Sequence, residues 1–324
     1  STRPSIPVAA SRPFRNSLHV NDPRRPPRRN VDGVLLLDKP LGMTSNAALQ
    51  VARRLYNAAK TGHTGTLDPL ATGLLPLCFG EATKFAGELL DADKAYDAVM
   101  QLGVTTDTAD AEGQVLLTRP VNVTSQQVSE ALQKHVGEIM QVPPMYSALK
   151  RDGKPLYEYA RQGIEVERAA RRVVIHKILL LSFSGDRLSI SVDCSKGTYI
   201  RTLAEDIGEM LGCGAHLVAL RRTRIGRLQL QQCVGLAEVE TCSGEQRDAL
   251  LATPDALLDS LPGAELQAAD AARLMHGQSV PWNGQPGRWL PHPRCGSAAT
   301  PAEWVVSARR AAHGGLDQGY SVRD

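Results

Sequence analysis

The segment Gly62–Leu75 constrains the fold more than any other part of the chain, because no regular helix or strand can run through all of it. Its three glycines allow backbone angles that are closed to other residues. Pro69 fixes the chain directly after Asp68, and a residue before proline avoids the helical region. We therefore predict a stiff loop that presents one carboxylate, Asp68, between the apolar residues Leu67 and Leu70.

A surface Asp-Pro turn is the simplest alternative interpretation of this loop. The sequence that follows argues against it, because residues 74–79 read Leu-Leu-Pro-Leu-Cys-Phe and are apolar enough for a buried strand. A loop that enters a buried strand directly lies close to the core. Asp68 is therefore the first candidate for a reactive carboxylate in this chain.

The chain has 324 residues, 42% of them hydrophobic, which suggests about two domains of ~150 residues with real cores. No apolar run approaches the ~18–20 residues that a membrane span needs. The six cysteines are scattered without a Cys-x-x-Cys pair, and the eight histidines show no metal-ligand spacing. These patterns favour free thiols in a reducing compartment over a disulfide framework or a zinc site.

Positive charge is concentrated in three stretches, although the net charge of the chain is only +3. Residues 1–30 contain seven arginines and one acidic residue, and residues 215–230 contain four arginines and no acidic residue. Lysines and arginines also outnumber acidic residues between residues 150 and 172. A solvated helix face would explain any one stretch, but three of them favour a docking surface for a polyanion, and for nucleic acid in particular.

Three regions are expected along the chain. Residues 1–30 are rich in proline, arginine and serine and predict a disordered basic leader, for which an organelle transit peptide, an over-extended start and an RNA-contacting tail all remain open. Residues 31–258 predict one α+β domain with a mixed sheet, because strands and helices alternate without a regular βαβ rhythm. Residues 259–324 predict a small C-terminal region whose pattern decays after residue 281.

Hydrophobic periodicity and capping signals predict the main elements of residues 31–258. Thr44 or Ser45 is expected to cap one helix, and Thr124 with Gln127 forms a capping box that opens another. A third helix is expected over about residues 199–211. The expected strands cover residues 33–37, 74–79, 94–102, 173–183 and 188–194.

Two further segments carry residues suited to chemistry. Tyr96 opens a predicted strand, where its ring could stack on a base, and Tyr199 and Arg201 lie at a strand-to-helix junction. A buried carboxylate needs a cationic partner to stay ionised, and arginine suits this role because it never deprotonates. Taken one at a time, the two tyrosines are more typical of core or rim aromatics, and Arg201 of a helix surface.

Several motifs, which keep their order along the chain, resemble those of the TruB-type tRNA pseudouridine synthases. The resemblance extends from about residue 33 to about residue 214, weakens after about residue 236 and largely vanishes after residue 281. It implies the mixed-sheet catalytic domain of a pseudouridine synthase. The motifs are Leu37–Pro40 with Gly42–Asn46, Gly62–Leu75, Gly80–Lys84, Thr106–Asp110, Pro144–Lys150, Leu156–Arg161 and Lys196–Arg201.

The resemblance implies an isomerase, without metal or redox cofactor, that flips out uridine 55 in the T-loop of tRNA and converts it to pseudouridine. Detaching uracil from C1′ builds positive charge on the sugar, so Asp68 would act as nucleophile or as electrostatic stabiliser, and both roles remain open. By the same resemblance Arg201 pairs with Asp68, Tyr96 stacks on the uracil, Tyr199 lines the pocket and Leu220 forms an apolar wall.

The resemblance also implies a surface for RNA. His63 would fill the space of the flipped base or hold the loop open, although a histidine that hydrogen-bonds within its own loop is an alternative. Residues 142–172 resemble an insertion that clamps the T-loop, and residues 259–324 would form at best a small RNA-binding module of the PUA type. The other residues expected to contact RNA are Lys39, Tyr146, Lys150, Arg161 and Arg221.

Two other functions remain as alternatives. The first is a protein that binds or refolds tRNA, with chemistry incidental or absent, and this activity can coexist with isomerisation. The second is a synthase that depends on a guide RNA, as dyskerin-related enzymes do, and it is disfavoured because residues 142–172 resemble the clamp of stand-alone enzymes. We therefore expect a monomer that acts on tRNA in the cytoplasm, with no membrane and no guide RNA.

Overall fold

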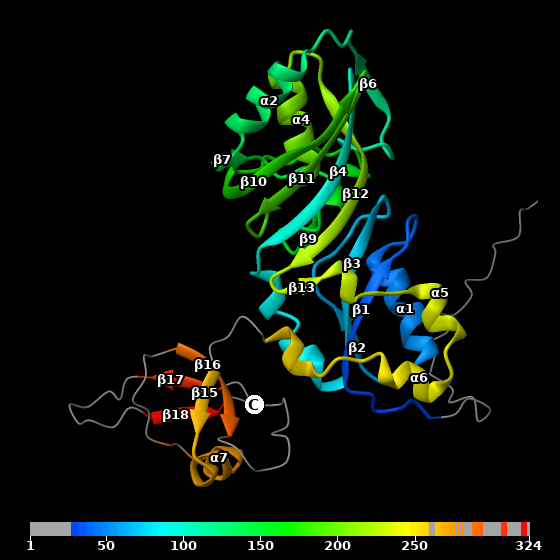
Figure 1. Cartoon of the computed structure of the whole chain (residues 1–324). Coiled ribbons are helices and arrows are strands. Elements are labelled where there is room, and N and C mark those ends of the chain that lie inside the picture. The colour runs from blue at the N-terminus through cyan, green and yellow to red at the C-terminus, as the bar shows by residue number, and fades with distance from the viewer. Residues whose placement is uncertain are drawn as a thin grey trace, which may run out of the picture.

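The computed structural model describes residues 27–258, 263–276, 278, 280, 287–293, 306–309 and 319–322. Its largest feature is a mixed sheet with the strand order β14-β1-β3-β12-β4-β11-β10-β7, in which β2 also pairs with β3 and β13 with β12 (Figure 1). The strands are β1 (Gly33–Lys39), β2 (Thr61–His63), β3 (Ala71–Phe79), β4 (Lys94–Leu102), β7 (Gly137–Gln141), β10 (Arg171–Ser184), β11 (Arg187–Cys194), β12 (Ala215–Ile225), β13 (Leu228–Gln229) and β14 (Val234–Gly235).

Strand β12 joins the two halves of this sheet. It runs parallel to β3 and antiparallel to β4, while β1 lies antiparallel to β3 on the other side. The sheet is therefore mixed and the chain is of the α+β class, as predicted. The arginines of this segment indicate a basic surface in the sequence, so β12 is not among the expected strands. Its register places Leu220 opposite Ala71 and Arg222 opposite Tyr96, which brings β12 beside the predicted site.

Helices α2 and α4 lie on the same face of the sheet (Figure 1), and α1 packs against β2. Thr44 caps α1 by accepting a hydrogen bond from the Ala47 amide at 3.0 Å, and Thr124 and Gln127 form the predicted capping box of α2. The helices are α1 (Ser45–Leu55), α2 (Ser125–Lys134), α3 (Leu156–Ala160), α4 (Ile200–Met210), α5 (Leu236–Thr241) and α6 (Gly244–Ala249), with 3-10 turns at Gly80–Phe85, Glu88–Leu90, Leu230–Gln232 and Pro254–Leu257.

The strand β4 carries the predicted alternation from the core to the site. Tyr96, Ala98, Met100 and Leu102 are all buried in one hydrophobic cluster with residues of α4, and the intervening side chains are less buried. This alternation is what a strand with one face on the core requires. Because Tyr96 is the first residue of the row, its ring lies where the core meets the neighbouring loops.

Smaller sheets accompany this core. Strand β5 (Val104–Thr106) pairs with β6 (Val115–Thr118), and β8 (Lys150–Arg151) pairs with β9 (Lys154–Pro155). A separate sheet follows with the order β15-β16-β17-β18. Regular structure therefore extends past residue 281, where the sequence pattern predicts no elements. The PUA type expected for this region stays a prediction. Its elements are β15 (Gly263–Leu266), α7 (Ala268–Met275), β16 (Gly287–Pro293), β17 (Val306–Arg309) and β18 (Gly319–Val322).

The predicted leader lies mostly in residues 1–26, which fall outside the described residues. Residues 27–30 are described and contact the domain: the Arg29 amide donates to the Asn57 carbonyl at 2.7 Å, and the Arg29 guanidinium pairs with Asp248 at 2.5 Å. Residues 27–30 of the predicted leader therefore belong to the described structure, and the domain boundary at residue 31 stays a prediction. Within the described part of the chain, no helix is long and apolar enough to cross a bilayer.

Candidate active site

The loop that carries Asp68 is held by hydrogen bonds on both sides of that residue. Ser45, buried at the start of α1, donates its hydroxyl to the Leu67 carbonyl at 3.0 Å and accepts from the Leu67 amide at 2.8 Å. On the other side, the Ala71 amide donates to the Asp68 carbonyl at 3.0 Å, and the chain passes directly into β3. Asp68 therefore stands on a stiff turn, as predicted.

Two glycines give this loop its shape. Gly65 and Gly73 have φ values of +74° and +99°, in the region that favours glycine. A Cβ at Gly73 would lie 2.3 Å from the Arg222 carbonyl oxygen, so no side chain fits between β3 and β12 there. Gly62 does not have a positive φ and lies in β2, so of the three glycines only Gly65 and Gly73 use the backbone angles that glycine allows.

Arg201 bridges Asp68 and a second carboxylate. Its Nη2 lies 3.0 Å from Asp68 Oδ2, and its Nη1 lies 3.4 Å from Asp110 Oδ2. The same guanidinium donates to the Thr108 carbonyl at 3.1 Å and to the Tyr146 carbonyl at 2.7 Å. Because guanidinium is planar with fixed donors, four partners leave it one orientation. Only 8% of the Arg201 side chain is exposed, against 45% for Asp68, so the cation is set behind the carboxylate.

The predicted catalytic residues converge on one cavity of about 190 Å³. Asp68 comes from the loop before β3, Tyr96 from β4, Tyr199 and Arg201 from the start of α4, and Leu220 from β12. Tyr96 is 8% exposed, so its ring forms an inner wall. The cavity thus combines one half-exposed carboxylate with two aromatic rings and an apolar side chain.

Burial sets the charge of this cavity. Although 45% of the Asp68 side chain is exposed through the mouth, burial raises the pKa of its carboxyl, while Arg201 opposes that rise and Asp110 adds to it. Burial also raises the pKa of Tyr96 and of Tyr199, so both phenols remain protonated at neutral pH. The pKa of His63 is lowered by burial and by Arg222, so this imidazole is neutral at pH 7.

A second cavity, of about 480 Å³, adjoins the first and shares Asp68 and Arg201 with it. Of the residues predicted to contact RNA, it collects His63, Tyr146 and Arg161. The Arg161 guanidinium lies over the Tyr157 ring at 5.3 Å from its centroid, a cation–π arrangement that holds a cation at the rim. Asp68 is therefore the point at which a deep pocket and a wider groove meet.

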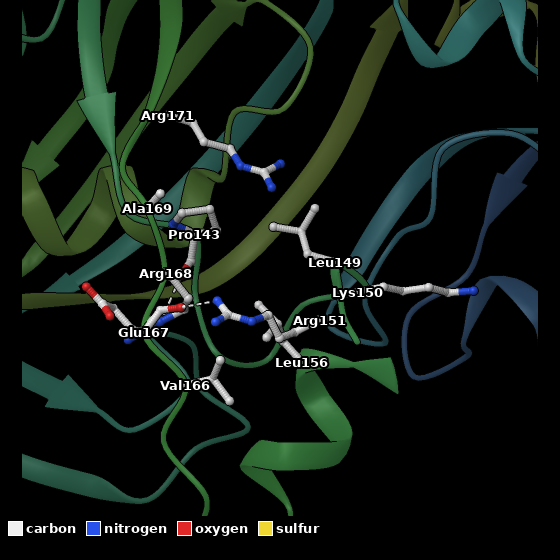
Figure 2. Close-up of a pocket in the computed structure, with 10 residues that line it drawn as sticks. All are labelled: Pro143, Leu149, Lys150, Arg151, Leu156, Val166, Glu167, Arg168, Ala169 and Arg171. Carbon is white, nitrogen blue, oxygen red and sulfur yellow. Dashed lines mark hydrogen bonds between the residues drawn. The ribbon is translucent and has the colours of Figure 1, made fainter. Parts of the chain in front are cut away.

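Figure 2 shows a third cavity, of about 180 Å³, inside residues 142–172. Arg168 donates to the Pro143 carbonyl at 3.0 Å, whereas the Lys150 side chain extends away from the other lining residues. Among the described residues, neither Lys150 nor Arg171 has an acidic partner. Arginine side chains thus surround an apolar floor that consists of Pro143, Leu149, Leu156, Val166 and Ala169.

Two family models match most of the domain that contains these cavities. "TruB family pseudouridylate synthase (N terminal domain)" matches residues 53–200, and "tRNA pseudouridylate synthase B C-terminal domain" matches residues 201–261. A protein of Aromatoleum aromaticum named tRNA pseudouridine synthase B is 64% identical over 251 residues, which cover 78% of this chain and 82% of that protein. The chain belongs to the TruB family of pseudouridylate synthases. As a member of this family it is an isomerase.

Further relatives and solved structures agree with this family. A Dechloromonas aromatica protein, also named tRNA pseudouridine synthase B, is 59% identical over 289 residues, or 89% of this chain and 94% of that protein. A chain in the crystal structure of a Cbf5-Nop10-Gar1 complex has a TM-score of 0.66 and 26% identity, with coverage of 90% of this chain and 83% of that one. The mixed-sheet fold is therefore that of the TruB family and of Cbf5.

The structure corrects one predicted RNA contact. Lys39 is fully buried and donates to the carbonyls of Pro40 at 2.9 Å and Met43 at 2.6 Å, so it cannot touch RNA directly. Burial lowers its pKa to about 8, while the charge of Asp68 opposes that change. The RNA contact expected of Arg221 stays a prediction. The Arg221 side chain is 41% exposed, but its guanidinium pairs with Asp38 at 2.6 Å.

Sequence reasoning missed two charged residues of this TruB-family site. Asp110 lies within one of the resembling motifs, but nothing marked it as the second partner of Arg201. Arg222 is 1% exposed and donates to the carbonyls of Leu74 and Gly65, both at 2.8 Å, so it links two parts of the Gly62–Leu75 loop. No signal in the sequence marks Arg222, because its place beside Leu220 on one face follows only once β12 is known to be a strand.

Proposed function

We propose that this chain converts uridine 55 in the T-loop of tRNA to pseudouridine, and that it does so alone, without a guide RNA. The observation that carries the proposal is the Asp68 carboxylate, held at 3.0 Å by Arg201 at the mouth of a cavity walled by Tyr96, Tyr199 and Leu220. The names of the relatives from Aromatoleum and Dechloromonas support tRNA as the substrate.

The reaction exchanges one bond of the uracil ring for another. The N1–C1′ bond breaks, the ring turns in the pocket, and a C5–C1′ bond forms; the proton on C5 then leaves and N1 carries a proton, so the composition is unchanged. Asp68 would either attack C1′ or stabilise its positive charge, and both need an ionised carboxylate. Tyr96 and Tyr199, which stay protonated at neutral pH, would hold the detached ring by stacking and packing.

The wider groove suits the RNA around a flipped base. Neutral His63, which lines this groove, would occupy the space that the base leaves, since an uncharged ring stacks among bases at low desolvation cost. The basic residues of segment 142–172, including Lys150, Arg161 and Arg171, would bind phosphates of the T-stem-loop. This segment would thus act as the clamp that the family resemblance implies.

The test uses an unmodified tRNA transcript and mass-spectrometric mapping of pseudouridine. Wild type should modify position 55, and Asp68→Asn should lower the single-turnover rate by at least about 10⁴-fold. Asp186→Asn, at an exposed turn between β10 and β11, is the matched control and should keep wild-type activity. Appreciable conversion by Asp68→Asn would remove Asp68 from the catalytic role.

RNA refolding is the alternative function, and the same variant separates it from catalysis. If Asp68→Asn binds the transcript as wild type does and also restores structure to a misfolded tRNA, the clamp has an activity of its own. Activity of wild type on naked tRNA would eliminate dependence on a guide RNA. A requirement for an added RNA would instead contradict the stand-alone proposal.

A further inference from the structure

Gln141 holds the backbone of Tyr199 at two points. Its Oε1 accepts a hydrogen bond from the Tyr199 amide at 3.0 Å, and its Nε2 donates to the Tyr199 carbonyl at 3.3 Å. The Gln141 side chain comes from the end of β7, 58 residues before Tyr199 in the chain, and the residue is only 2% exposed. A buried amide that serves both polar groups of one residue leaves that residue little freedom to move.

The residue held in this way begins the helix that carries the catalytic arginine. Tyr199 is the N-cap of α4, and no side-chain hydrogen bond from the cap itself supports it. The Tyr199 carbonyl also accepts a hydrogen bond from the Leu203 amide at 3.0 Å. The first turn of α4 is therefore bonded to the same carbonyl that Gln141 holds. Arg201 lies in that first turn. The hydrogen bonds from Gln141 to Tyr199 therefore also fix the backbone position from which the Arg201 side chain extends to Asp68.

We propose that Gln141 is a positioning residue of the isomerase, which sets Tyr199 and Arg201 against Asp68 without touching the substrate. This inference rests on the function proposed above. Of the side chains with this length, only glutamine offers at neutral pH one acceptor for the amide and one donor for the carbonyl of the same residue. Methionine has a similar shape but cannot donate, and asparagine is one methylene too short to reach both groups.

Gln141 also directly precedes segment 142–172, the proposed RNA clamp. It is the last residue of β7 and lies opposite Arg171, the first residue of β10, so the chain of segment 142–172 leaves the sheet after Gln141 and rejoins it at Arg171. Arg171 lines the cavity of Figure 2. The clamp and the start of α4 therefore share one anchor, and RNA held by the clamp is placed in register with the catalytic pocket.

The experiment measures the rate and the affinity separately. Gln141→Met should lower the single-turnover rate on the tRNA transcript by roughly 10- to 100-fold, the loss expected from a misplacement of about 1 Å, with the Kd for RNA within twofold of wild type. Gln141→Asn should lose less rate, because it keeps the amide. Gln101→Met is the matched control, since that glutamine also donates two side-chain hydrogen bonds but lies further along β4 from the pocket.

A purely structural role would lower stability, or rate and affinity together, and thermal unfolding of each variant checks this. If Gln141→Met keeps the wild-type rate, or weakens RNA binding as much as it slows the reaction, the positioning role is wrong. If Gln141→Met does not fold, Gln141→Asn decides by the same two measurements. Failure of wild type to make pseudouridine would overturn the proposed function instead, so the two failures are distinguishable.

Discussion

Replacing Arg201 by methionine should destabilise the fold by about 3–5 kcal/mol, because it leaves a buried carboxylate without its cation. That carboxylate is Asp110, whose side chain is 4% exposed, beside an Arg201 side chain that is 8% exposed. Water therefore cannot replace the lost partner. The carbonyls of Thr108 and Tyr146 lose a donor as well. Asp68 contributes less to the loss, because it is 45% exposed.

Urea and thermal unfolding followed by circular dichroism measure this cost. For a domain of this size each kcal/mol lowers the Tm by about 2–4 °C, so the expected loss is about 6–20 °C. Arg119→Met is the matched control, because Arg119 pairs with Glu209 on the same helix α4, with side-chain exposures of 32% and 53%. An exposed pair is worth less than about 1 kcal/mol. The control should therefore shift the Tm by only a few degrees.

A double variant separates the stability lost through the unpaired Asp110 charge from the stability lost through missing packing. Asp110→Asn added to Arg201→Met removes the unpaired buried charge, so it should regain part of the lost stability. It should not regain activity, because Asp68 still lacks its cation. If Arg201→Met costs no more than Arg119→Met, or if the double variant is no more stable than the single one, Arg201 and Asp110 do not form a buried ion pair.

Two further predictions concern stability near the site. Burial lowers the pKa of Lys39 from 10.5 to about 8, so between these values the unfolded chain binds more protons than the folded one, and this group adds stability as the pH rises. Lys39→Met should reduce the slope of unfolding free energy against pH in that window by up to about 1.4 kcal/mol per pH unit, and an unchanged slope would contradict the burial. Gly73→Ala should cost about 3–5 kcal/mol, because its Cβ would lie 2.3 Å from the Arg222 carbonyl oxygen at a positive φ. Gly153→Ala, at φ +79° in open space, should cost only about 1–2 kcal/mol, and equal losses in urea unfolding would contradict the close approach.

Local sequence signals were sufficient for elements whose stability is itself local. The ends of β4 match the alternating segment Lys94–Leu102, and the capping box at Thr124 opens α2 as predicted. Strand β12 could not be predicted in this way, since its arginines break the apolar pattern of a central strand. Its pairing depends on β3 and β4, and on the loop carbonyls that accept from Arg222. Strand formation there is decided by tertiary contacts rather than by propensity.

The same distinction applies to the site. Asp68 could be found because glycine, proline and an acid combine in one short loop, whereas the pairing of Arg201 with Asp68 came from the resemblance to the TruB-type synthases. Lys39 was misplaced because a lysine in a motif looks the same whether its ammonium reaches solvent or, as here, two backbone carbonyls. Asp110 was missed because sharing one guanidinium between two acids is a property of three segments that meet only in the fold.

That sharing has a chemical consequence for Asp68. A carboxylate paired with a guanidinium of its own is pulled toward a low pKa and becomes a weak nucleophile, whereas Arg201 divides its charge between Asp68 and Asp110. Asp110 moreover raises the pKa of Asp68 directly, in the same direction as burial. Arg201 thus fixes the position of the carboxylate while only partly neutralising it, and Asp110 fixes Arg201. The result is a carboxylate that is held in place and only partly neutralised, as the proposed attack on C1′ or stabilisation of its positive charge would require.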